Sequence, residues 1–94
     1  MTNPTQNTAC MRILHLEDSE LDHALVAREL ARSGEDFEIH RVETLVAFSN
    51  ALDQTNFNVV LADYRLNGFT AMDAWQIMQS TAARLPFVLL SGAI

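Results

Sequence analysis

One stretch of the chain decides its fold: residues 58–65, which read Asn-Val-Val-Leu-Ala-Asp-Tyr-Arg. An unbroken apolar run from Val59 to Ala62 ends abruptly in the carboxylate of Asp63. A short continuous apolar run between polar residues is typical of a strand that is buried on both faces of a parallel sheet. Ligands of open α/β sheets bind outside the carboxyl ends of the strands. We therefore expect Asp63 to stand at the functional edge of such a sheet.

Two further apolar runs end in polar residues. Residues 13–16 read Ile-Leu-His-Leu and are followed by Glu17 and Asp18, and residues 86–90 read Pro-Phe-Val-Leu-Leu and are followed by Ser91. Because the carboxyl ends of parallel strands meet at the same edge of a sheet, three carboxylates and one hydroxyl are expected to converge there. This convergence is the main functional signal in the sequence.

Length and composition bound the class of protein. The 94 residues suffice for one small domain, and the 49% share of hydrophobic residues is typical of a globular one. The net charge of −6 argues against direct binding of nucleic acid, and no apolar run approaches the roughly 20 residues of a membrane span. Cys10 is the one cysteine, which excludes an internal disulfide and favours a reducing, cytoplasmic setting.

Strand-like and helix-like segments alternate along the chain. Strands are expected over residues 12–16, 37–42, 57–62 and 86–90, and helices over residues 20–33, after Thr44, and over residues 70–82. Ser19, Thr44 and Thr70 are the expected helix caps, with Asp73 completing a capping box and Gly34 ending the first helix. The order β-α-β-α-β-α-β predicts parallel βαβ units. Residues 1–11 are predicted to form a flexible leader, residues 12–94 the domain, and residues 65–69 a loop in which Gly68 can take a positive φ.

The sequence stops at Ile94, directly after the fourth expected strand. A sheet closed at that point would leave the apolar residues 87–90 partly exposed. An uncovered strand edge invites pairing with another chain. We therefore expect an incomplete domain, or one completed by a partner, with a homo-oligomer or strand exchange through the fourth strand as a possible outcome.

Three carboxylates in one pocket repel one another unless a cation lies between them. Mg²⁺ suits such a site, because it prefers oxygen ligands and takes only a few of them from the protein. A carboxylate beside Mg²⁺ can act as a nucleophile towards phosphorus and form an acyl phosphate. In this interpretation Asp63 attacks, and the Ser91 hydroxyl binds a phosphoryl oxygen.

Each of these residues also has a purely structural interpretation. Acidic residues after strands are common as turn formers and helix caps, and Ser91 alone could be a loop serine. His15 is expected to be a core histidine with satisfied hydrogen bonds, and Trp75 and Met78 are expected to be core residues. His23 and His40 show no metal-site spacing, and the Arg65 side chain is expected to point to solvent.

Residues 13–19, 59–66 and 86–93 resemble the three motifs of the receiver domain of bacterial two-component response regulators. The resemblance covers residues 12–94 and implies a flavodoxin-like, doubly wound parallel sheet with strand order 2-1-3-4-5. It implies that Asp63 accepts a phosphoryl group from the phosphohistidine of a sensor histidine kinase or phosphotransfer protein. The domain would then be a signalling module, not an enzyme, that switches an output domain of a longer chain.

The resemblance also assigns roles to other positions. Glu17 and Asp18 match the acidic pair that serves Mg²⁺, and Arg65 matches the residue whose backbone carbonyl binds the metal. Ser91 matches the hydroxyl residue that turns towards the phosphoryl group, and Gly92 matches the small residue after it.

The sequence departs from the family pattern in three respects. Asn67 stands near a usual proline, and Ala71 stands where glycine is common. The segments that would form the fourth helix, fifth strand and fifth helix are missing. The family's lysine, which pairs with the phosphoryl group, has no counterpart because all six Lys and Arg residues of the chain are arginines.

Other functions fit parts of the same pattern. A receiver-like interaction or oligomerisation module without phosphoryl chemistry would explain the missing lysine and the bare fourth strand. A Mg²⁺-dependent phosphatase with an aspartate nucleophile would require a second Asp as general acid where Arg65 stands. A flavodoxin would require a Ser/Thr/Gly-rich phosphate loop after the first strand, and none follows it.

Overall fold

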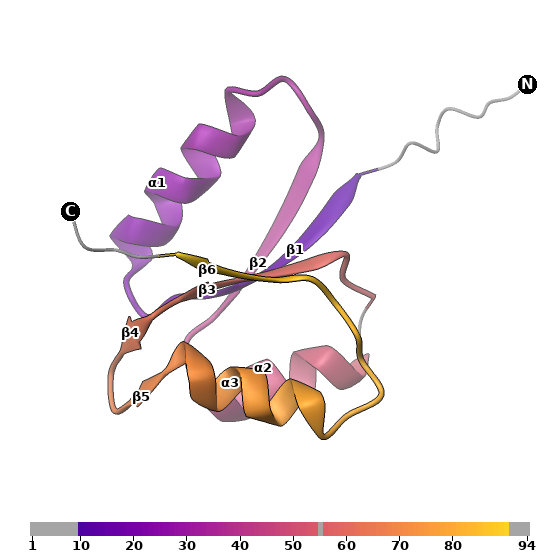
Figure 1. Cartoon of the computed structure of the whole chain (residues 1–94). Helices are drawn as coiled ribbons and strands as arrows, with labels where there is room; N and C mark the ends of the chain where they lie inside the picture. Colours follow the sequence, from indigo (N-terminus) through magenta and orange to yellow (C-terminus); the bar gives the residue numbers. More distant parts are fainter. Residues whose placement is uncertain (1–9, 55, 91–94) are drawn as a thin grey trace, which may run out of the picture.

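The computed structural model describes residues 10–54 and 56–90, which form a parallel sheet with helices on both faces (Figure 1). The elements in chain order are β1 (Met11–Leu16), α1 (Glu20–Ala31), β2 (Phe37–Val42), α2 (Leu45–Gln54), β3 (Val59–Asp63), β4 (Arg65–Leu66), β5 (Phe69–Thr70), α3 (Ala71–Gln79) and β6 (Phe87–Leu90). Residues 1–9 lie outside the described part of the chain, so the expected leader stays a prediction; Met11 already belongs to β1.

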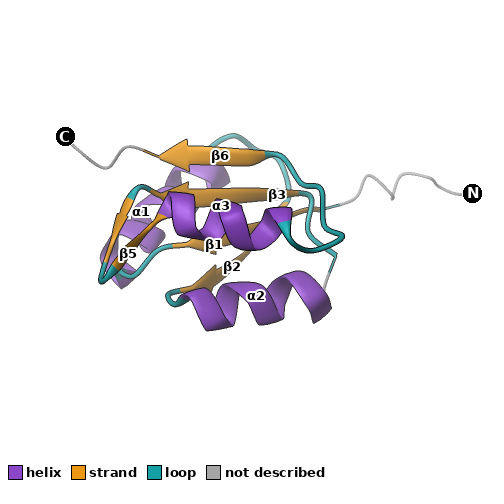
Figure 2. Cartoon of the chain, turned by 60° about the horizontal axis from the view of Figure 1, so that its bottom comes forward, coloured by secondary structure: helices purple, strands orange, loops and turns teal. Residues whose placement is uncertain are grey.

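The main sheet has the strand order β2-β1-β3-β6, and all neighbouring strands are parallel. Figure 2 shows β2 at one edge of this sheet and β6 at the other. Helix α1 lies on one face, and α2 and α3 lie on the other (Figure 1). The predicted α/β class and flavodoxin-like strand order are therefore confirmed for these four strands, in the order 2-1-3-4.

The hydrophobic core lies between the sheet and the pair α2 and α3. Alternate residues of β1 and β3 face these helices and are fully buried, including Leu14, Val60 and Ala62. Phe48 from α2 and Met78 from α3 fill the space opposite them, with 0% and 1% exposure. Phe48 and Ala51 thus form the buried face of α2.

The opposite face of the sheet is packed differently. Helix α1 contains no buried residue, and its Leu21 and Leu25 side chains are 70% and 51% exposed. The helix predicted over residues 20–33 is at the right place, but these leucines cover little of the sheet. The stability of the described domain therefore rests mainly on the α2 and α3 side.

The predicted helix caps are confirmed. The side chains of Ser19 and Thr44 accept hydrogen bonds from the backbone N–H groups of Asp22 and Ala47 at 3.1 and 3.0 Å. At the start of α3, Thr70 and Asp73 form a reciprocal capping box. These caps place the first turn of each helix and therefore the loops that precede it.

Several predicted boundaries are wrong. Helix α1 ends at Ala31, with Arg32 as its C-cap, so Gly34 (φ +83°) lies in the turn beyond it. Helix α3 ends at Gln79 instead of residue 82, because the side chains of Ser80 and Thr81 bond back to the carbonyls of the last turn. Strand β3 begins at Val59 instead of residue 57 and includes Asp63.

The predicted loop over residues 65–69 is a small hairpin instead. Strands β4 and β5 pair antiparallel, with Leu66 opposite Phe69 and a two-residue turn of Asn67 and Gly68 between them. Gly68 has the positive φ that was predicted, +85°, whereas Asn67 has no positive φ. Asn-Gly between paired strands is a strong hairpin signal that the sequence did contain.

Strand β6 lies at an edge of the sheet, as expected of the fourth main strand. Within the described residues it pairs only with β3, and Val88 and Leu89 are 42% and 50% exposed. Met78 is a core residue as predicted, but Trp75 is 38% exposed and packs edge-to-face on Phe87. Among the described residues, no helix has the length and apolar character needed to span a membrane.

The burial pattern of α2 yields a direct test. We expect Phe48→Ala to lower the free energy of unfolding by about 3–5 kcal/mol, because it leaves a cavity in the core. Val46→Ala, on the exposed side of the same helix, is the matched control and should change stability by no more than about 0.5 kcal/mol. Chemical denaturation followed by circular dichroism measures both values, and equal losses would contradict the described packing.

Candidate functional site

Three carboxylates gather at the carboxyl edge of the sheet. Glu17 and Asp18 directly follow β1, and Asp63 is the last residue of β3. Because β1 and β3 are parallel neighbours, with Leu16 opposite Ala62, the residues after these two positions lie side by side. One carboxylate oxygen of each acid lies within 4.8 Å of those of the other two. The predicted convergence of Glu17, Asp18 and Asp63 is therefore present in the structure.

Glu17 is the most deeply placed of the three, with 3% exposure. Its backbone N–H donates to the Val42 carbonyl at the end of β2, at 2.9 Å. Its Oε2 accepts a hydrogen bond from the Ser19 N–H at 3.2 Å. The Arg41 guanidinium donates to its backbone carbonyl at 3.0 Å. These bonds hold the start of the β1–α1 loop against the end of β2.

Asp18 connects the same loop to the hairpin. Its Oδ2 accepts a hydrogen bond from the backbone N–H of Asn67 at 2.8 Å. Arg65, two residues after Asp63, begins β4 opposite Thr70, and its side chain is exposed as predicted. The metal-binding role expected for the Arg65 backbone carbonyl stays a prediction.

Burial and like charge raise the pKa values of two of the acids. Burial, with added repulsion from Asp63, Asp22 and Asp18, raises the pKa of Glu17 to about 7, although the hydrogen bond from Ser19 opposes this change. Burial and the charges of Asp18 and Asp22 also raise the pKa of Asp63. Such a group of acids favours a cation that neutralises it, and carboxylate oxygens are the ligands that Mg²⁺ prefers.

Ser91 and Gly92, the predicted phosphoryl-sensing residues, lie outside the described residues. The described chain leads up to them: Leu90 pairs with Asp63, and its carbonyl accepts a hydrogen bond from the Tyr64 N–H at 3.1 Å. Their roles stay predictions.

Two histidines lie behind the acidic group, and the sequence interpretation missed their contact. His15 is completely buried, and its Nδ1 lies 2.9 Å from Nδ1 of His23 on α1. His15 Nε2 has no hydrogen-bond partner among the described residues and lies 3.9 Å from Oε1 of Glu17. The expectation of a satisfied core histidine is therefore wrong in one respect: the ring is buried, but one nitrogen is unpaired. The alternation of β1 was the available signal, since it turns His15 away from the core face that holds Leu14 and Leu16.

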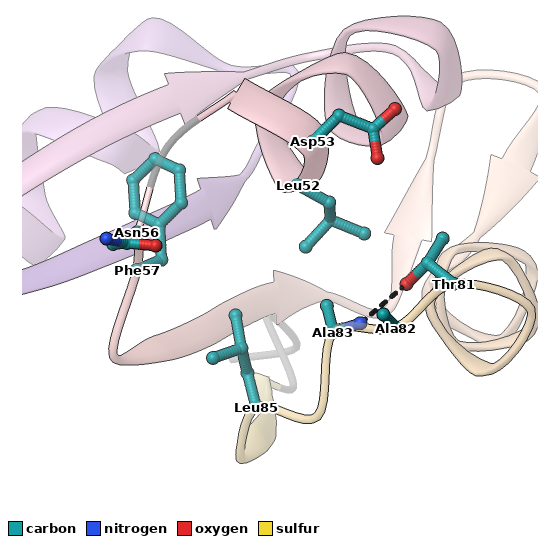
Figure 3. Close-up of a pocket in the computed structure, with 8 residues that line it drawn as sticks. All are labelled: Leu52, Asp53, Asn56, Phe57, Thr81, Ala82, Ala83 and Leu85. Atoms are coloured by element: carbon teal, nitrogen blue, oxygen red, sulfur yellow. Dashed lines mark hydrogen bonds between the residues drawn. The ribbon is translucent and has the colours of Figure 1, made fainter.

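A hollow of about 360 Å³ lies at the other end of the strands, between the last turn of α2 and the α3–β6 connection (Figure 3). Leu52, Phe57 and Leu85 form its apolar lining, and Asp53 and Thr81 stand at its side. Thr81 accepts a hydrogen bond from the Ala83 N–H at 3.1 Å, as the dashed line in Figure 3 shows. Phe57 precedes β3 whereas Asp63 ends it, so this hollow is separate from the acidic group.

The raised pKa of Glu17 predicts how stability depends on pH without divalent cations. The folded chain holds the Glu17 proton up to about pH 7, whereas the unfolded chain releases it near the ordinary pKa of 4.5. The folded chain therefore binds more protons than the unfolded chain in this pH interval, and the free energy of unfolding falls as the pH rises through it. We expect Glu17→Gln to become more stable relative to the wild type by roughly 1–3 kcal/mol from pH 4.5 to pH 7, measured by urea unfolding.

The shifted pKa of His15 changes the pH dependence of stability in the opposite direction. It does so in the wild type and in Glu17→Gln alike, so it does not affect the difference between them. Burial lowers its pKa from 6.5 to about 4, so its contribution to stability is lost as the pH falls through that range. Glu35→Gln, at an exposed position, is the control for the loss of one carboxylate from the chain. A difference between wild type and Glu17→Gln that is constant with pH would contradict the prediction.

Comparison with known proteins places this geometry in a known fold. No protein-family model and no curated protein sequence matches the chain. Among solved structures, the response regulator MaeR bound to beryllium trifluoride matches with a TM-score of 0.76 and 24% identity, over 89% of this chain and 69% of that one. A MaeR mutant bound to sulfate matches with a TM-score of 0.77 and 23% identity, over 92% and 70%.

The complex of histidine kinase ThkA with the response regulator TrrA also contains a match, with a TM-score of 0.72 and 21% identity, over 89% of this chain and 71% of that one. The acidic group and the strand order thus occur within a fold that this chain shares with response regulators. The chain has the fold of the receiver domains of response regulators.

Proposed function

We propose that this chain is the receiver module of a two-component phosphorelay and that Asp63 is its phosphoacceptor. The observation that carries the proposal is the position of Asp63: it ends β3 within a group of three carboxylates, in a fold shared with response regulators. Residues 11–94 form the module, since Met11 already belongs to β1, and residues 1–10 precede it as a leader. The activity belongs to signal transduction in the cytoplasm, without an enzymatic turnover of its own.

In the proposed reaction, one Asp63 oxygen attacks the phosphorus of a phosphohistidine. A P–O bond to Asp63 forms, the P–N bond to the histidine breaks, and the imidazole leaves with the electron pair of that bond. The donor is a sensor histidine kinase or a phosphotransfer protein. The solved complex of the response regulator TrrA with a histidine kinase supports a donor of this kind.

The donor set fits Mg²⁺, because Glu17, Asp18 and Asp63 offer three oxygen ligands within 4.8 Å of one another. We assign these three carboxylates and the Arg65 backbone carbonyl as its ligands. When bound, Mg²⁺ neutralises charge on the acids and on the phosphoryl oxygens. The Asn67 N–H bond to Asp18 positions this carboxylate, and the Ser19 N–H bond does the same for Glu17.

Ser91 and Gly92 complete the proposed site on the side of β6. The hydroxyl of Ser91 binds a phosphoryl oxygen, and the movement that follows biases an output domain in a longer chain. MaeR with bound beryllium trifluoride supports an anion site in this fold, since that anion resembles a phosphoryl group in shape.

Phosphorylation gives the decisive test. The full-length protein is incubated with Mg²⁺ and acetyl phosphate, and its intact mass is measured. We expect a gain of one phosphoryl group that is absent from Asp63→Asn and strongly reduced in Asp18→Asn, because the first change removes the nucleophile and the second removes a metal ligand.

Asp53→Asn is the matched control, since Asp53 is exposed beside the separate hollow at the opposite end of the strands. It should be modified as the wild type is. A folded wild-type protein that gains no phosphoryl group, or an Asp63→Asn variant that still does, would rule out the proposal.

The exposure of the β6 side chains favours a second function, a receiver-like interaction module without phosphoryl chemistry. Val88 and Leu89 are 42% and 50% exposed on an edge strand, and such a strand can pair with another chain. Sedimentation of the unmodified protein over a range of concentrations distinguishes the two functions. A monomer at all concentrations would contradict self-association through β6.

A further inference from the structure

The two histidines behind the acidic group are joined in a way that demands a particular arrangement of protons. Their Nδ1 atoms lie 2.9 Å apart, and the ring centroids lie 5.1 Å apart with the planes tilted by 32°. A neutral imidazole carries one N–H and one lone pair. At this distance two facing N–H groups would clash and two facing lone pairs would repel, so one of the two Nδ1 atoms carries a hydrogen and the other presents its lone pair. One of the two Nδ1 atoms must then donate a hydrogen bond to the other.

When Glu17 is ionised, only one of the two possible arrangements satisfies His15. If His15 carried its hydrogen on Nδ1, the lone pair of its completely buried Nε2 would face the carboxylate of Glu17. If His23 donates instead, His15 accepts at Nδ1 and carries its hydrogen on Nε2, which lies 3.9 Å from Oε1 of Glu17. A rotation of the Glu17 side chain that closes this gap by about 1 Å makes an ordinary N–H···O hydrogen bond.

The surroundings of the pair favour the second arrangement. Arg41, whose side chain is 20% exposed, donates to the Glu17 carbonyl and lies 3.5 Å from the Glu20 carboxylate. The other oxygen of Glu17, Oε2, already accepts from the Ser19 N–H. Oε1 is therefore the Glu17 atom that can accept from His15 while the carboxylate still faces Asp18 and Asp63.

We propose that His23, His15 and Glu17 form a hydrogen-bonded relay in which His23 Nδ1–H donates to His15 Nδ1 and His15 Nε2–H donates to Glu17 Oε1, and that this relay positions Glu17 for the divalent cation. His15 and His23 are positioning residues, because neither touches the cation. The inference rests on the proposed function for the identity of the cation. It also connects the acidic group to α1, so that binding of the cation changes the environment of the His23 ring.

Outer partners of metal ligands typically change metal affinity by 10–100-fold when they are removed. The test measures Mg²⁺ affinity of the full-length protein by calorimetry at pH 8. Asparagine and glutamine form a matched pair, since an Asn amide can replace the Nδ1 position of histidine and a Gln amide can place an N–H near the Nε2 position. We expect His15→Leu and His15→Asn to bind Mg²⁺ about 10-fold more weakly, and His15→Gln to stay within about threefold of the wild type.

His23→Leu is a second variant for the case in which changes at the buried His15 prevent folding. His23 is only half-buried, so its replacement is tolerated more easily. It should weaken Mg²⁺ binding as well, and the double variant His15→Leu/His23→Leu should be no weaker than His15→Leu alone, as expected of residues that act in one chain. A folded His15→Leu or His23→Leu protein that binds Mg²⁺ as tightly as the wild type would overturn the relay.

The protonation of the rings is read independently of metal binding. Long-range ¹H–¹⁵N spectra at pH 8 should show His15 with its hydrogen on Nε2 and His23 with its hydrogen on Nδ1, and both sets of resonances should shift when Mg²⁺ is added. The opposite tautomers would overturn the relay. A wild-type protein that binds no Mg²⁺ would contradict the proposed function instead, and the tautomers alone would then decide whether the relay exists.

Discussion

The parallel pairing of β1 with β3 is the constraint on which the candidate site depends. It sets Leu16 opposite Ala62 and so brings the acids that follow β1 beside the acid that ends β3. Like charges at this separation repel one another, and the burial of Glu17 adds to the cost of its ionisation. The hydrogen bonds around the group come from three different segments: the β1–α1 loop, the β4–β5 turn and Arg41 of β2. The edge of the sheet is thus built to hold carboxylates together, which is what a divalent cation requires.

The two faces of the sheet differ in what they contain. The face towards α2 and α3 holds the closely packed core, in which Leu14, Val60 and Phe48 are fully buried. The face towards α1 holds the His15–His23 pair and exposes leucines of the helix. Polar groups behind the acidic site therefore lie on the face whose covering helix contributes no buried residue of its own. This asymmetry explains how a buried histidine can lie beside the site without disturbing the fold.

Much of this arrangement was predictable because it depends on local patterns. Three apolar runs and the alternating segment 37–42 predicted the four parallel strands, and Ser19, Thr44 and Thr70 correctly predicted the starts of the helices. The helix ends were predicted less well, since side-chain bonds such as that of Ser80 to the Ile77 carbonyl decide where a helix stops. The β4–β5 hairpin could have been found from Asn67-Gly68, but two-residue strands have no hydrophobic period of their own.

The sequence by itself determined that Glu17, Asp18 and Asp63 would share one edge, because parallel strands that end in acids leave no other place for them. The tertiary structure alone decided which side chains surround that edge. His15 and His23 are eight residues apart on a strand and a helix, and no spacing rule connects two such elements. Their contact follows from the way α1 lies across β1, so the neighbours of Glu17 depend on packing between elements, whereas the grouping of the acids depends only on strand order.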